Sequence, residues 1–341
     1  MNRTDRGLLI PLLLGGGVVL VLSIAVAVTI GPASVSVADV YRVILAHIGI
    51  GSAQVSRIQD GIVWELRLPR TLLASICGAG LALCGAIMQS LLRNPLADPF
   101  VLGISSGAST GAVVIAVLGV GGGALSLSTG AFAGALLSFL LVMLLAAGAG
   151  GGNDRVVLAG VAGTQLFSAL TSFIVISSAD AEQTRGVLFW LLGSLSGADW
   201  SDVALCGTVA LLGMVVCLLN TSALDAFTFG HDAAASLGVP VKGVRILLLV
   251  ITALITAALV SAAGAIGFVG LVLPHAARFL VGARHRRLLP TTVLIGAIFM
   301  VWVDTIARTV FAPQEIPVGV VTALIGVPAF ALILFRLRRS R

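Results

Sequence analysis

The sequence predicts an all-α polytopic membrane protein with about ten transmembrane helices. The chain has 341 residues, of which 58% are hydrophobic and only 10% are charged, whereas a soluble domain carries about 25% charged residues. Apolar runs of roughly the 20 residues needed to cross a bilayer recur along the whole length. The 41 glycines suit such a bundle, because small residues let membrane helices pack closely. We therefore treat residues 1–341 as one membrane domain.

The apolar runs define the expected spans in order. They cover about 7–30, 69–92, 99–119, 128–148, 156–177, 201–219, 243–263, 266–282, 289–309 and 317–335. The first run is longer than the apolar core of a signal peptide, so we expect it to be retained as a span. The third and eighth runs are the shortest or are interrupted by glycine. A further run at 183–197 is too short to cross and is predicted to be an interfacial helix on the outer side.

Arginines indicate the orientation of these spans. With the N-terminus inside, more basic residues fall in cytoplasmic segments than outside, including Arg284, Arg286 and Arg287. This bias places both termini in the cytoplasm of a bacterial cell. The halves, about 1–180 and 181–341, would each hold five spans. An odd number per half inverts the second half relative to the first, as in many transporters.

Several functions are excluded by residue usage. The net charge of +6 comes from basic residues scattered between apolar runs, which argues against a nucleic-acid partner. A P-loop requires Gly-Lys-Ser/Thr, yet the single lysine, Lys242, lies in Pro-Val-Lys-Gly-Val. The chain is therefore expected to be no P-loop enzyme. The four cysteines lie inside apolar runs without Cys-x-x-Cys spacing, so we expect small core residues and no metal site.

Four motifs occur in an order that resembles a known family. They are Trp64-Glu-Leu-Arg-Leu-Pro-Arg70, Arg93-Asn-Pro-Leu-Ala-Asp-Pro99, Gly230-His-Asp-Ala-Ala-Ala-Ser-Leu-Gly238 and Gly267-Phe-Val-Gly-Leu-Val-Leu-Pro-His-Ala-Ala-Arg278. Together they resemble the FecCD-type permease subunits of ATP-driven (ABC) importers for ferric siderophores, haem and cobalamin. The resemblance covers nearly the whole chain.

The resemblance implies an import function with separate subunits. The chain would move a ferric siderophore complex across the cytoplasmic membrane by alternating access, with haem or cobalamin as alternative substrates. Its expected partners are two copies of an ATPase subunit, an extracytoplasmic substrate-binding protein, and a second permease copy or paralogue. No cofactor is expected on this chain, because ATP and Mg would bind the ATPase. A proton-coupled secondary transporter is less favoured, since Asp304 is the one candidate carboxylate within a span.

Three arginines lie at predicted outer span ends, namely Arg67, Arg70 and Arg308. Spacing alone favours helix anchors that reach the lipid head groups. The family resemblance implies instead that they receive acidic residues from the two lobes of the binding protein. Arginine suits this role because it is always charged and forks onto carboxylates.

The longest polar inner segment, about 220–241, is predicted to form two short helices joined near Gly230. Pattern alone also allows an amphipathic loop lying on the membrane. By resemblance it is the coupling loop that enters a cleft of the ATPase. The coupling residues expected there are Phe227, Phe229, Gly230, His231, Asp232, Ala233, Ala234, Leu237 and Gly238. His275, and the pair His285 and Arg286, are assigned to structure and inner-surface contact and not to metal ligation.

Glycine and proline interrupt helices at matching places in the two halves, and broken helices usually line a cavity. The expected polar lining of a central path comprises Gln89, Asn94, Ser105, Ser106, Ser109 and Gln165. Small-residue packing is an equally good explanation of each single position. By resemblance, Asn153 and Asp154 lie where the family narrows its path on the inner side.

Overall fold

The computed structural model describes residues 3–339, apart from 32, 34 and 51–54. The described residues are 79% helical and contain no strand. Backbone groups in a bilayer must be satisfied internally, which helices do within one segment. The predicted all-α class is therefore confirmed.

Ten helices correspond to the ten predicted spans. Seven helices of the described chain are long and apolar enough to cross a membrane, and three shorter apolar ones accompany them. The predicted short third and eighth spans are α5 and α13, whereas the tenth, α15, also falls in the shorter group. The span helices are α1 (Arg3–Thr29), α4 (Leu68–Leu91), α5 (Ile104–Ala116), α6 (Leu127–Gly148), α7 (Asn153–Ser178), α9 (Trp200–Leu219), α12 (Val241–Ala263), α13 (Val269–Val281), α14 (His285–Thr309) and α15 (Val318–Arg339).

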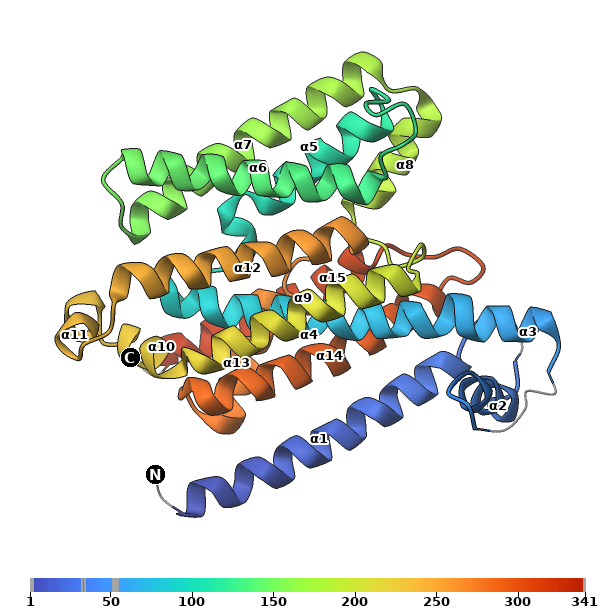
Figure 1. The fold of residues 1–341 in the computed structure, drawn as a ribbon, viewed down its shortest axis with the longest axis horizontal. Helices are drawn as coiled ribbons and strands as arrows, with labels where there is room; N and C mark the ends of the chain where they lie inside the picture. Colours follow the sequence, from blue (N-terminus) through green and yellow to red (C-terminus); the bar gives the residue numbers. More distant parts are fainter. Residues whose placement is uncertain (1–2, 32, 34, 51–54, 340–341) are drawn as a thin grey trace.

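The connecting helices gather at the two ends of the bundle (Figure 1). At one end lie α10 (Thr221–Phe227) and α11 (His231–Ser236), together with the start of α1 and the end of α15. At the other end lie α2 (Val37–His47), α3 (Arg57–Gly61) and α8 (Ala181–Leu191). We call these the α11 end and the α3 end. Helix α1 runs from the α11 end and α9 runs toward it, so the two halves begin in opposite directions.

Helix α4 is the centre of the bundle. It packs against α1, α9, α12, α13 and α14, and almost all of its residues are buried. Glycines permit the closest crossings, because a Cβ added at Gly78 would lie 2.0 Å from the carbonyl oxygen of Gly296, and one at Gly85 would lie 1.9 Å from that of Gly270. Backbones of α4, α14 and α13 therefore meet without intervening side chains.

Two elements differ from the sequence prediction. The second span begins at Arg57 and not near residue 69, because α3, the π-helical turn η1 (Ile62–Arg67) and α4 form one continuous helix. The wide turn directly before Pro69 accommodates a residue that lacks an N–H and clashes with the preceding turn. Helix α2 was not predicted; its signal is the cap in which the Ser36 hydroxyl accepts from the Asp39 N–H.

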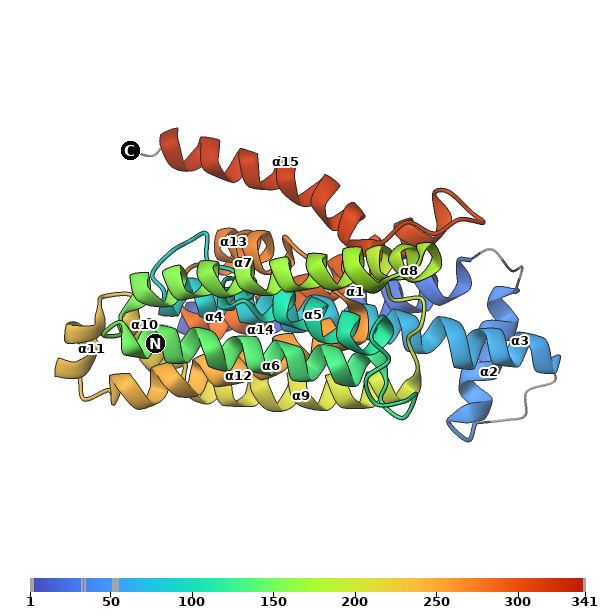
Figure 2. The same ribbon diagram turned by 90° about the horizontal axis from the view of Figure 1, so that it is seen from above.

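Figure 2 shows the relation of α15 to the bundle. Its last turns lie apart from the packed helices, and large apolar side chains such as Leu332 and Phe335 are exposed along it. The predicted interfacial segment 183–197 is partly helical, since α8 occupies Ala181–Leu191 and the chain then turns at Gly193.

An arginine cluster, a two-helix coupling segment and the family they define

The predicted outer arginines come together at the α3 end. Arg70 Nε donates to Asp304 Oδ1 at 2.9 Å, and its Nη1 donates to Glu315 Oε1 at the same distance. Arg308 Nε lies 3.6 Å from Asp304 Oδ2. Asp304 is thus held between guanidinium groups of α4 and α14, and it is only 1% exposed. We call Arg67, Arg70, Asp304, Arg308 and Glu315 the arginine cluster.

Arg67 and Arg308 also hold the end of α1. Arg67 donates to the carbonyl oxygens of Val28, Thr29 and Ala33, and Arg308 Nη2 donates to that of Ala27 at 2.6 Å. The last carbonyls of a helix have no partner within it, so two cations there satisfy them and oppose the negative end of the helix dipole. The three arginines are therefore not free rim side chains, because each is 9% exposed or less.

The arginine cluster nevertheless faces open space. A cavity of about 240 Å³ is lined by Ala33, Ile62, Leu66, Arg67, Arg70, Ser196, Arg308 and Glu315. Three guanidinium groups face two carboxylates in the cluster, which leaves one positive charge in excess. An additional carboxylate entering this cavity would balance that charge.

The segment between α9 and α12 has the predicted two-helix form. Gly230 separates α10 from α11 with φ +111° and ψ 162°, a conformation that is essentially restricted to glycine. Gly238 ends α11 with φ +81°, and the N–H groups of Gly238 and Val239 donate back to Ala235 and Ala234. This is the usual glycine stop of a helix.

The predicted coupling residues divide into a buried anchor and an exposed surface. Phe227 and Ala234 are fully buried and hold the segment against the bundle. Phe229 is 77% exposed and Leu237 is 71% exposed, while Asp232 and Gly238 are also exposed and Ala233 is half-buried. The side chain of His231 lies outside the described part of the chain. Phe227, predicted as one of the coupling residues, is thus part of the anchor.

In the described part of the chain, the predicted path residues lie at several separate places. Gln89 lies in the α4–α13 contact, where its Nε2 donates to Gly270 and its Oε1 accepts from Arg278. Ser106 and Ser109 donate to carbonyls of their own helix, and Ser105 is half-buried. Asn94, Asp154 and Gln165 are exposed. Asn153 Nδ2 donates to the carbonyl of Leu91 and so joins the start of α7 to the end of α4.

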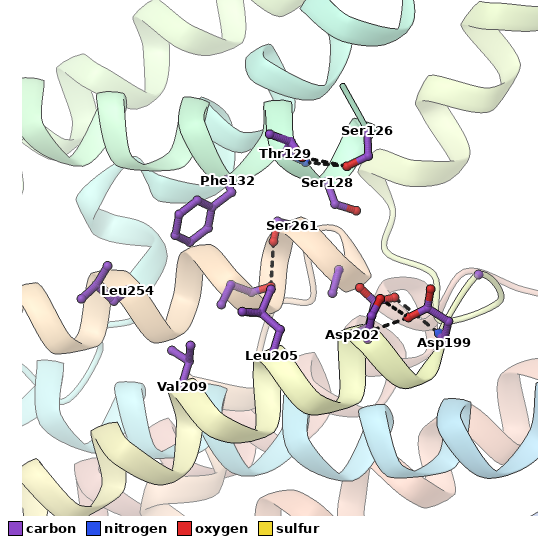
Figure 3. A pocket seen from close by; sticks show the side chains of 14 residues that line it. Ser126, Ser128, Thr129, Phe132, Asp199, Asp202, Leu205, Val209, Leu254 and Ser261 are labelled. Carbon is purple, nitrogen blue, oxygen red and sulfur yellow. Dashed lines mark hydrogen bonds between the residues drawn. The ribbon is translucent and has the colours of Figure 1, made fainter. Parts of the chain in front are cut away.

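A larger cavity that the sequence analysis missed opens between α6, α9 and α12 (Figure 3). It measures about 600 Å³ and has hydroxyl and carboxylate groups at one end and Phe132, Leu205 and Leu254 along its walls. Ser126 caps α6 and Asp199 caps α9. Hydrogen bonds from the Ser201 hydroxyl and the Asp202 N–H hold the pKa of Asp199 below its usual value. The Asp-x-x-Asp and Ser-x-x-Thr helix starts are signals that could have located this polar rim.

The bundle of span helices, with short helices beyond the spans at each end, is the architecture of a polytopic membrane protein, and comparison with known proteins gives its family. The model of the FecCD transport family matches residues 19–336. The chain belongs to this family and is a multi-pass membrane protein.

Three relatives with different named substrates are similar to most of the chain. The chain is 42% identical to the cobalamin import permease BtuC of Halobacterium salinarum, over 80% of this chain and 73% of that protein. It is 40% identical to the hemin permease HmuU of Yersinia pestis, over 82% of this chain and 85% of that protein. It is 37% identical to the Fe(3+)-citrate permease YfmD of Bacillus subtilis, over 82% of each.

Among solved structures, an inward-facing metal-chelate type ABC transporter superposes with a TM-score of 0.83 at 32% identity. The match covers 95% of this chain and 98% of that one. The helical arrangement is therefore that of an ABC transporter permease.

Proposed function

We propose that this chain is the membrane conduit of an importer for a ferric siderophore, loaded at the α3 end and powered at the α11 end. In this proposal both termini and the α10–α11 segment are cytoplasmic. Two ATPase subunits hold ATP and Mg, and a second permease, identical or paralogous, completes the path by alternating access. The observation that carries the proposal is the α10–α11 segment, a buried anchor with exposed apolar side chains at a polar end of the molecule.

The exposed side chains of this segment suit a soluble protein partner. The exposed Phe229 lies between the two short helices, and the exposed Leu237 directly follows the second of them. Such apolar groups at a polar surface mark an interaction site. The buried side chains of Phe227 and Ala234 would transmit force from that partner to the bundle.

Replacing Phe229 tests this assignment. Phe229→Asp is expected to reduce co-purification of the permease with its ATPase by about tenfold or more, as for loss of an aromatic anchor. The matched control is Phe311→Asp, since Phe311 is 63% exposed and directly follows the end of α14 that carries Arg308. Full retention of the ATPase by Phe229→Asp would contradict the assignment.

The arginine cluster supports docking of the binding protein at the α3 end. Its cavity and its excess positive charge fit a carboxylate side chain from an approaching protein. Because Arg67 and Arg308 also hold α1, replacing both by Glu would damage the fold as well as docking. A milder change is needed to test docking alone.

Arg67→Lys keeps the charge but loses the fork that pairs with a carboxylate. We expect about tenfold weaker binding of the substrate-binding protein to the permease in nanodiscs. Arg57→Lys, at an exposed site of the same end, is expected to leave binding unchanged. If both variants bind the substrate-binding protein with equal affinity, the arginine cluster is not part of the docking site.

The substrate class is a bulky metal chelate. Support comes from the relatives, which are named for Fe(3+)-citrate, hemin and cobalamin, and from a structural neighbour described as a metal-chelate transporter. The higher identity to the cobalamin permease favours cobalamin as the second candidate.

Competition between chelates separates these candidates. The cognate binding protein is titrated with a ferric hydroxamate, haem and cobalamin, and uptake is then measured with each. Siderophore transport predicts that the ferric chelate binds tightest and is the substrate accumulated. Preference for cobalamin or haem would replace the siderophore assignment without changing the family.

A further inference from the structure

His285, which was assigned to structure and inner-surface contact, lies at the junction of three elements. It is 1% exposed and begins α14. Its Nδ1 lies 2.7 Å from Asp225 Oδ1 in α10, and its Nε2 lies 2.6 Å from Ser90 Oγ near the end of α4. The backbone N–H of His285 donates to the same Asp225 oxygen at 2.9 Å. The three side chains form a continuous chain of hydrogen bonds, which we call the Ser90–His285–Asp225 link.

The donors in this link can be assigned from chemistry. A carboxylate only accepts hydrogen bonds, so the ring carries a proton on Nδ1. In the neutral ring, Nε2 then accepts the single hydroxyl hydrogen of Ser90, so that this hydrogen is not donated at the same time to the Ala86 carbonyl 3.0 Å away. Every bond of the link has a donor and an acceptor, and the ring orientation is fixed from both sides.

This arrangement resembles a hydrolase triad, but its serine and histidine are both buried. Ser90 is 6% exposed, and its hydroxyl is also within 3.0 Å of the carbonyl of Ala86 in its own helix. A nucleophile must reach a reacting atom beside it. Burial of both Ser90 and His285 therefore indicates a mechanical role.

The same two helices carry the arginine cluster at their other ends. Helix α4 holds Ser90 at the α11 end and Arg70 at the α3 end, and α14 holds His285 and Asp304 in the same way. Between these ends the Gly78 and Gly296 backbones touch. The helix pair is thus connected at both ends and in close contact at its middle.

A second contact joins α4 to the α10–α11 segment. Arg93, just beyond α4, adopts φ +49°, and its Nη1 would lie 3.6 Å from a Cβ at Gly230. Helix α10 also packs against α4 and α14. Movement of α10 must therefore displace the ends of both central helices.

From these contacts we infer that His285 is a positioning residue, which links the α10–α11 segment through Asp225 and Ser90 to the α4–α14 pair and thereby to the arginine cluster. This role rests on the proposed function: the α4–α14 pair communicates between the ATPase end and the binding-protein end. Rigid elements with defined contacts at both ends are suited to carry coupling energy.

The test measures substrate taken up per ATP hydrolysed in proteoliposomes containing the complete transporter. Ser90→Ala removes the partner of Nε2, and His285→Asn keeps a donor near Nδ1 but does not reach Ser90. Both are expected to lower the ratio by about fivefold or more. Asp225→Asn keeps an acceptor oxygen and should give nearly the wild-type ratio of uptake to hydrolysis. Asp225→Ala should lower that ratio as much as Ser90→Ala and His285→Asn do.

The matched control is Ser261→Ala, because Ser261 is another buried serine, donating to Ala258 in its own helix. It should keep the wild-type ratio. If Ser90→Ala and His285→Asn keep that ratio, or lose hydrolysis and uptake in equal proportion, the link has no coupling role and the inference is overturned. A wild-type complex that fails to couple ATP to uptake would instead overturn the proposed function.

Discussion

At the scale of single residues, the arginine cluster shows how charge is accommodated at a span end. Asp304 and Arg308 are almost completely buried, and each retains one polar atom, Oδ2 and Nε, without a hydrogen-bond partner. These two buried atoms are tolerated without a hydrogen bond because each lies beside a group of opposite charge. The cluster therefore depends on all of its members.

Removing Arg70 should expose that dependence. Arg70→Ala leaves the Asp304 carboxylate without its closest donor, and we expect a loss of about 3–5 kcal/mol in stability. Thermal unfolding in detergent measures it. Arg42→Ala removes an exposed pair with Asp39 and should change stability by less than about 1 kcal/mol; similar losses for both variants would contradict this view.

The cap of α9 gives a prediction about pH. Because hydrogen bonds lower the pKa of Asp199 in the folded state, its ionised form stabilises the start of α9. That stabilisation is complete above the unfolded pKa of about 3.9 and is lost as pH falls through the lower folded value. The protection factors of the first-turn amides of α9 in hydrogen exchange, taken against the intrinsic rate at each pH, should therefore fall on acidification in the wild type. Asp199→Asn should remove this pH dependence, and unchanged dependence in the variant would contradict the assignment.

At the scale of elements, glycine contacts determine how closely the helices approach. The composition predicted a tightly packed bundle, but it did not identify which glycines cross. Gly85 and Gly270 are distant in the sequence, and only the folded arrangement brings their backbones together. Helix α2 was missed because hydropathy detects membrane spans, and its eleven residues are too few to form one.

A methyl group at Gly85 should force α4 and α13 apart. Gly85→Ala is expected to destabilise by about 1–3 kcal/mol, the usual cost of overpacking, as measured by thermal unfolding. Gly243→Ala in α12 meets open space and should be neutral or slightly stabilising. Equal unfolding temperatures for the two variants would contradict the close crossing.

The hinge between α10 and α11 gives a second prediction for an element. Gly230→Ala must adopt a conformation that costs a non-glycine residue about 1–3 kcal/mol, so the α10–α11 segment should lose its shape while the spans remain folded. We expect weaker assembly with the ATPase, measured by co-purification. Gly186→Ala in α8, where a Cβ meets nothing within 4 Å, is the control. Normal assembly of Gly230→Ala would show that the hinge conformation is unimportant.

At the scale of the whole molecule, hydropathy predicted the ten spans because a bilayer leaves helices as the available structure for each apolar run. Sequence motifs predicted the candidate sites at the two ends of the bundle, including the glycine hinge of the α10–α11 segment. Long-range partners did not follow: Arg70 and Glu315 are 245 positions apart, and no local pattern links them. For the same reason the burial of His285 and the polar cavity of Figure 3 became visible only in three dimensions.

The central claim is that this chain is a conduit driven by separate subunits at its two ends. Its most direct test is accumulation of a labelled ferric siderophore in proteoliposomes containing the permease with and without its ATPase and binding protein. We predict concentrative uptake only in the complete assembly supplied with MgATP, and no accumulation by the permease alone under an imposed proton gradient. Accumulation by the isolated permease, driven by that gradient without nucleotide, would contradict the account.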